Sequence, residues 1–191
     1  KYKSKKSYRK LISSGWFIND YMSLDMVQSN IFNYFKNDID NHFNKIKENI
    51  NKEKYSILEE IILLYNNNKY HLPIISLYTL IDSYLLEIGL PLFSNEKKID
   101  RKDIVRNLKI SYPYLDIYLD NLLSIILDRK DRNKNKHSKN TDNVKNKNIL
   151  LNRHAIIHGI SSKFGTEKNF YKVLSLYIFL IDFKNRINKH I

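Results

Sequence analysis

The segment NRHAIIHG, residues 152–159, gathers an arginine and two histidines in a chain that is otherwise rich in Asn, Lys and Ile. A histidine titrates near neutral pH, and an arginine guanidinium holds phosphate oxygens through two parallel hydrogen bonds. These groups suit metal-free cleavage of RNA, in which a histidine takes the proton of the ribose 2′-hydroxyl or protonates the leaving 5′-oxygen. Because one histidine cannot easily do both, we expect two copies of the segment to face each other in a symmetric dimer.

The spacing predicts a helix over 149–158 that ends at Gly159. On that helix His154 and His158 share a face, whereas Arg153 and His158 are about 140° apart and converge only if the helix ends or loosens at Gly159. Two other interpretations stay open. Arginine and histidine stabilise the carbonyls of a helix end, and two histidines four residues apart can bind a metal ion. The glutamate of the HExxH motif is absent and no third ligand can be identified, so neither a metal nor a cofactor is expected.

The stretch from Arg153 to His158 resembles the R-x4-H signature of the HEPN superfamily, in which the residue after the arginine is polar, as His154 is here. The resemblance covers six of 191 residues together with their setting on a late helix. It implies a metal-independent endoribonuclease that acts as a homodimer in bacterial toxin, abortive-infection or anti-phage systems. Arg153 and His158 would be catalytic, and His154 and Asn152 would support the site.

Two alternatives belong to other functional classes. The first is a catalytically inactive HEPN-like bundle that dimerises or binds an antitoxin or sensor partner, and the second is a basic helical nucleic-acid-binding protein. The formal charge of +13 and the isoelectric point near 9.6 favour an anionic partner such as RNA, although an AT-rich genome also enriches lysine. Residues 129–148 have almost no apolar side chains and predict a flexible basic loop, in which Lys134, Lys136 and Lys139 are candidate RNA contacts. A minimal HEPN bundle would not need this loop.

The expected fold is an all-α, HEPN-like bundle forming one domain over 1–191, with residues 1–50 as an N-terminal helical extension. The chain has only 4 Gly and 3 Pro, and its apolar residues recur at three- and four-residue spacing. We expect helices over 7–14, 29–50, 55–65, 71–90, 114–128 and 149–158. The helix over 71–90 is expected to be central, and the final helix, capped by Thr166, to bury one side that carries Phe170, Val173, Leu174, Tyr177, Leu180 and Ile181.

Three further residues have both a structural and a functional interpretation, and two more have a structural one. Asp82 lies in the most apolar helix, where it either pairs with Arg153 and fixes the guanidinium or marks a solvent-facing stripe. Tyr78 and Tyr84 could stack on RNA bases, but tyrosine at helical spacing is more often part of a core. His71 is expected in a turn at a helix start, and Trp16 is expected to anchor the N-terminal segment.

Composition excludes several classes of protein. The chain has no cysteine, which rules out disulfides and thiolate chemistry and is compatible with the cytoplasm. Its longest apolar stretches are shorter than the roughly 18 residues that a membrane span needs. The sequence begins at Lys1 without an apolar signal region, so we expect no signal peptide, and the chain can be part of a longer polypeptide.

Overall fold

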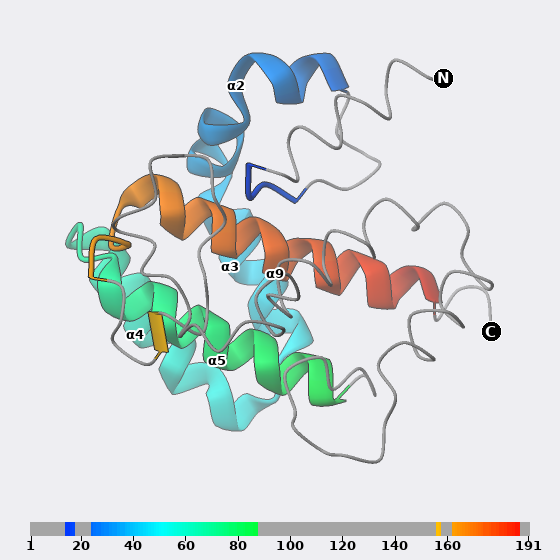
Figure 1. Cartoon of the computed structure of the whole chain (residues 1–191). Helices are drawn as coiled ribbons and strands as arrows, with labels where there is room; N and C mark the ends of the chain where they lie inside the picture. Colours follow the sequence, from blue (N-terminus) through cyan, green and yellow to red (C-terminus); the bar gives the residue numbers. More distant parts are fainter. Residues whose placement is uncertain (1–13, 18–23, 88–155, 158–161, 188–191) are drawn as a thin grey trace, which may run out of the picture.

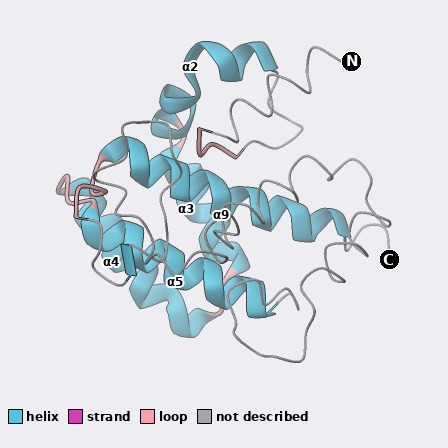
Figure 2. Ribbon diagram, viewed as in Figure 1, coloured by secondary structure: helices cyan, strands magenta, loops and turns pink. Residues whose placement is uncertain are grey.

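A computed structural model describes residues 14–17, 24–87, 156–157 and 162–187 of the chain. All regular secondary structure in these ranges is helical, which confirms the all-α prediction (Figure 2). The expected helices over 7–14, 114–128 and most of 149–158, and the basic loop 129–148, lie outside the described residues. The described elements are α2 (Leu24–Asn37), α3 (Ile39–Asn49), the 3-10 helix η1 (Lys52–Lys54), α4 (Tyr55–Asn66), α5 (His71–Glu87) and α9 (Glu167–Ile187).

Helix α9 runs through the middle of the described bundle (Figure 1). It contacts α2, α3 and α5, while α4 packs between α3 and α5. Every residue from 170 to 183 is buried, including the polar Lys172, Ser175 and Asp182. Helix α5, by contrast, exposes Leu72 and Leu86. The prediction that 71–90 is the central helix is therefore wrong for the described residues, in which α9 is the most enclosed.

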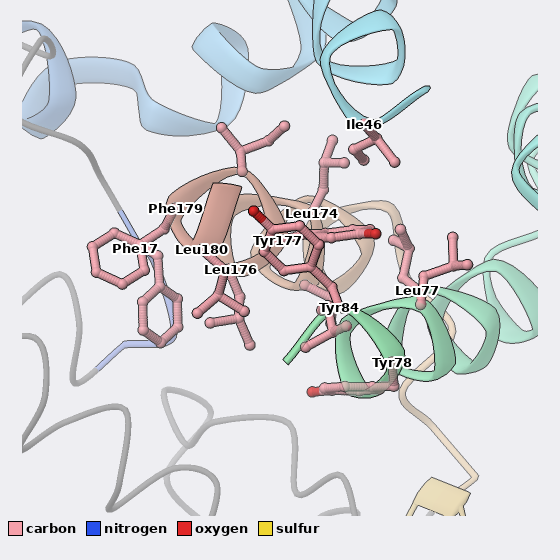
Figure 3. Packing of buried hydrophobic residues seen from close by; sticks show 14 of the residues in the cluster. Phe17, Ile46, Leu77, Tyr78, Tyr84, Leu174, Leu176, Tyr177, Phe179 and Leu180 are labelled. Atoms are coloured by element: carbon pink, nitrogen blue, oxygen red, sulfur yellow. The ribbon is translucent and has the colours of Figure 1, made fainter. Parts of the chain in front are cut away.

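The expected one-sided burial of the final helix is also corrected. The six predicted residues are buried, but so are Leu176, Phe179 and Phe183 on the remaining sides. The Phe179 ring lies 5.8 Å from the ring of Phe17, so the N-terminal segment covers one of these sides. Figure 3 shows Phe17 and Phe179 together at one end of the buried cluster, with Tyr84 and Leu77 of α5 beneath α9.

The predicted helix over 29–50 is two helices. Its apolar stripe faces the core as expected, with Phe35, Phe43 and Ile46 fully enclosed. Helix α2 ends at Asn37, however, and α3 begins at Ile39. Helix α2 is itself kinked at Asn30, whose side-chain oxygen accepts a hydrogen bond from the Asn33 backbone amide at 3.3 Å. Asparagine side chains compete for backbone groups in this way, and apolar spacing does not reveal that competition.

The two helices predicted over 55–65 and 71–90 correspond to α4 and α5, which pack against each other as a hairpin. The chain reverses at Asn68, which has a positive φ of 57° that asparagine tolerates better than most residues. His71 lies at the start of α5, as expected, and Pro73 lies in its first turn, where its missing N–H is tolerated.

Residues 162–166 connect the motif segment to α9 and lie against the start of α5. The His71 ring contacts Phe164 at 5.0 Å, and its Nε2 lies 3.0 Å from the Ser162 carbonyl oxygen. Thr166 is the N-cap of α9, because its hydroxyl accepts a hydrogen bond from the Asn169 backbone amide at 3.2 Å, which confirms the predicted cap. The loop and the hairpin are therefore held together at this end of the bundle.

No described helix is long and apolar enough to cross a membrane.

Candidate functional site

Only the centre of the NRHAIIHG segment belongs to the described residues. Ile156 and Ile157 are helical, as the predicted helix over 149–158 requires. Ile156 is buried at 3% exposure within the main core, whereas Ile157 is 41% exposed. At these two residues, therefore, one side of the chain lies on the core and another at the surface. Asn152, Arg153, His154 and His158 lie outside the described residues, as do Lys134, Lys136 and Lys139.

Asp82 is the one predicted site residue that the structure describes. It is half-buried in the middle of α5, and one of its carboxylate oxygens is fully enclosed. Its neighbour Ser83 donates a hydrogen bond to Glu87 at 3.3 Å, and the ammonium of Lys54 contacts both residues. Because its carboxylate is partly enclosed, Asp82 fits a place in the packed structure better than a place on a solvent-facing stripe of α5. The proposed partner, Arg153, is outside the described residues.

The two candidate stacking tyrosines are core residues. Tyr78 is 4% exposed and Tyr84 is 1% exposed, so neither ring is available to an RNA base. The Tyr84 ring packs edge-on against Tyr177 at 5.7 Å. Burial raises the pKa of the Tyr84 and Tyr177 phenols, and the nearby Asp182 raises that of Tyr84 further. The hydroxyls of Tyr84 and Tyr177 are enclosed without a hydrogen-bond partner among the described residues, so these two phenols stay neutral at physiological pH.

His42 is a buried titratable group that the sequence did not single out. It is 4% exposed and lies against the rings of Phe35 at 4.9 Å and Tyr34 at 5.7 Å. Burial lowers its pKa, as Lys45 also does, while Asp38 and Asp182 act in the opposite direction. Its Nε2 has no hydrogen-bond partner within the described chain, so the neutral ring is favoured at this position.

Polar side chains on the otherwise apolar α9 are the other feature that sequence reasoning missed. Asp182 accepts a hydrogen bond from the Lys45 ammonium at 2.5 Å, which ties α3 to the C-terminal half of α9. Lys172 is 6% exposed, and burial, followed by the charge of Lys168, lowers its pKa to about 8. The sequence did contain a signal for Lys172 and Asp182, because each is a charged residue within a run of apolar residues.

No group of three or more His, Cys, Asp or Glu side chains able to hold a metal ion occurs within the described ranges. Comparisons with protein-family models, curated proteins and solved structures find no match for the chain. Any functional assignment therefore depends on the motif, its helical setting and the charge of the chain.

Proposed function

We propose that this chain is a metal-independent endoribonuclease of the HEPN type that acts as a homodimer, as a toxin or an anti-phage effector. Arg153 and His158 are the catalytic pair in this proposal, and His154, Asn152 and Asp82 support them. The lysines of the 129–148 loop, including Lys134, Lys136 and Lys139, collect RNA through its phosphates.

The observation that carries the proposal is the burial of Ile156 beside the exposed Ile157, both in helical conformation. On the helix that the sequence predicts, His154 and His158 each lie two positions from Ile156, about 160° away from the buried side. That face suits contact with RNA and with a second copy. Arg153, three positions before Ile156, would lie about 60° from the buried side, which suits an ion pair with a half-buried carboxylate such as Asp82.

The proposed reaction follows from these roles. A histidine takes the proton of the ribose 2′-hydroxyl, and the 2′-oxygen attacks the adjacent phosphorus. The bond from phosphorus to the 5′-oxygen breaks, and the histidine of the second copy protonates that leaving oxygen. Arg153 stabilises the charge on the non-bridging oxygens as it builds. The products are a 2′,3′-cyclic phosphate and a 5′-hydroxyl.

The experiment is cleavage of labelled single-stranded RNA in the presence of EDTA. We expect wild-type cleavage to persist in EDTA and to fall by at least about 100-fold in Arg153→Ala and in His158→Ala, the range for loss of a general acid–base or a charge-stabilising group. His190→Ala, which changes a histidine outside the motif, should cleave like the wild type.

Circular dichroism and the mass in solution separate loss of chemistry from loss of fold. A wild-type chain that dimerises but cuts no RNA would overturn the nuclease proposal and favour the dimerisation or partner-binding module. A wild-type chain that is monomeric at micromolar concentration would overturn the dimeric site.

A further inference from the structure

Lys172 is a buried cation on α9 that the proposed nuclease chemistry does not use. Its side chain lies along Gly15, and its Nζ is 3.6 Å from the position that a Cβ on Gly15 would occupy. The side chain as a whole is 6% exposed. A lysine can bury its aliphatic stem against apolar surface while its ammonium stays polar, and a largely buried lysine of this kind calls for a compensating anion.

No carboxylate of the described residues pairs with this ammonium. Glu167, at the start of the same helix, pairs with Lys36 of α2 at 3.0 Å. In the described part of the chain, a second cation, Lys168, lies one turn earlier on α9 and its charge lowers the pKa of Lys172. Within the described residues this largely buried ammonium has like charge beside it, which costs free energy that an anion would offset.

The turn beside Lys172 is held in place by buried contacts. The Phe17 backbone amide donates to the Ser175 hydroxyl at 3.1 Å, and that hydroxyl donates to the Lys172 carbonyl at 2.7 Å. Trp16 stacks on Phe35 with 5.9 Å between the ring centroids. Gly15 itself has a φ of 92°, a conformation that residues with side chains rarely adopt. The ammonium therefore lies against a fixed backbone turn and has little freedom to move away.

We propose that Lys172 and Lys168 form a binding site for an oxyanion of the phosphate class beside the Gly15 turn. Two cations four residues apart on a helix repel each other, and an anion that contacts both would offset that repulsion. Free phosphate and a phosphate group of a nucleic-acid chain present the same oxygens to the two ammonium groups. The site does not depend on the nuclease proposal, because it uses neither the motif nor cleavage.

The test is an NMR titration of the lysine ammonium groups with inorganic phosphate. We expect the pKa of Lys172 to start near 8 and to rise by at least about one unit at saturation, because a bound anion favours the charged form. In Lys172→Met the saturable phosphate response of Lys168 should be lost. In Lys168→Gln the phosphate response should weaken and the starting pKa should rise, because the neighbouring charge is gone.

Lys52→Gln, an exposed lysine in η1, is the matched control and should leave the titration unchanged. A second arm of the experiment replaces phosphate with a short oligonucleotide. If the pKa shift of Lys172 saturates at a lower concentration of oligonucleotide than of phosphate, the preferred source of the oxyanion is a nucleic-acid backbone. A Lys172 pKa that does not respond to either probe would overturn the proposal, as would an equal response in Lys172→Met. RNA cleavage is not measured here, so failure of the anion site and failure of the nuclease remain distinguishable.

Discussion

At the scale of single residues, His42 makes stability depend on pH. Burial lowers its pKa in the folded protein below the ordinary value of 6.5, so the unfolded chain binds more protons in mildly acidic solution. The contribution of His42 is therefore present above pH 6.5 and is lost as the pH falls through and below that value. Protonation would place a cation against Phe35 and Tyr34, with Lys45 adding repulsion and Asp38 and Asp182 opposing it.

His42→Phe should remove this dependence while keeping an aromatic ring in the same place. Urea unfolding at a series of pH values from about 5 to 8 measures the pH dependence of the free energy of unfolding. The difference in this free energy between two pH values reports the protons taken up on unfolding. We expect the wild type to lose more stability than the variant on acidification. Parallel curves for the two proteins would show that His42 does not titrate differently on folding.

Gly165 lies directly beside the His71 ring at the start of α5. A Cβ at this position would overlap the His71 ring, so Gly165→Ala should destabilise the protein by about 1–3 kcal/mol, the usual cost of overpacking. In His71→Ala the ring is gone, and adding Gly165→Ala to that variant should cost much less. Thermal unfolding of the two single variants and the double variant measures the coupling. Additive losses would contradict the steric explanation.

At the scale of elements, the start of α9 depends on Thr166. Its hydroxyl satisfies the Asn169 amide, one of the backbone donors that a helix leaves unpaired at its N-terminus. Thr166→Ala should cost about 1 kcal/mol, and Thr166→Ser should retain most of the stability because serine caps equally well. Chemical denaturation of both variants tests this, and equal losses would mean that the methyl group rather than the hydroxyl matters.

Periodicity predicted most of the described helices and little of their relative burial. The apolar residues of α4 and α5 and the Thr166 cap appear where the sequence placed them, because local spacing and capping chemistry specify them. The break between α2 and α3 was missed because the stripe from Phe35 to Ile46 continues across it. The full burial of α9 was missed because Phe17, far away in sequence, covers Phe179. Contacts of this kind depend on tertiary packing, which a helical wheel does not contain.

The candidate site was less predictable than the fold. Asp82 was identified because a carboxylate in an apolar helix is unusual, and the structure encloses part of it. Tyr78 and Tyr84 could have stacked on RNA bases or packed in the core, and their burial shows that they are core residues. Lys172 was passed over because a lysine near a helix start usually faces solvent, and only the Gly15 turn packed over its side chain changes that.

At the scale of the whole molecule, the charge of +13 predicts RNA binding that weakens with salt. Replacing Lys134, Lys136 and Lys139 together by glutamine should reduce affinity and lower the salt slope by about 2, since each phosphate contact on a single strand contributes roughly 0.7. Fluorescence anisotropy at several salt concentrations measures both quantities. Lys52→Gln combined with Lys69→Gln, two exposed lysines around α4, is the control and should change the slope less. Equal effects would mean that binding follows net charge and not the loop.

A composite dimeric centre makes a quantitative prediction about mixed subunits. If each centre needs His158 from both copies, a wild-type chain paired with a His158→Ala chain is inactive. A ninefold excess of His158→Ala, mixed under conditions in which subunits exchange, should then reduce cleavage per wild-type chain about tenfold, because nearly every wild-type chain has a variant partner. The same excess of His190→Ala should instead increase total cleavage in proportion to the added protein. Cleavage per wild-type chain that is unaffected by the His158→Ala excess would mean that each copy holds a complete centre, and the second histidine of the proposed reaction would then have to come from His154 of the same chain.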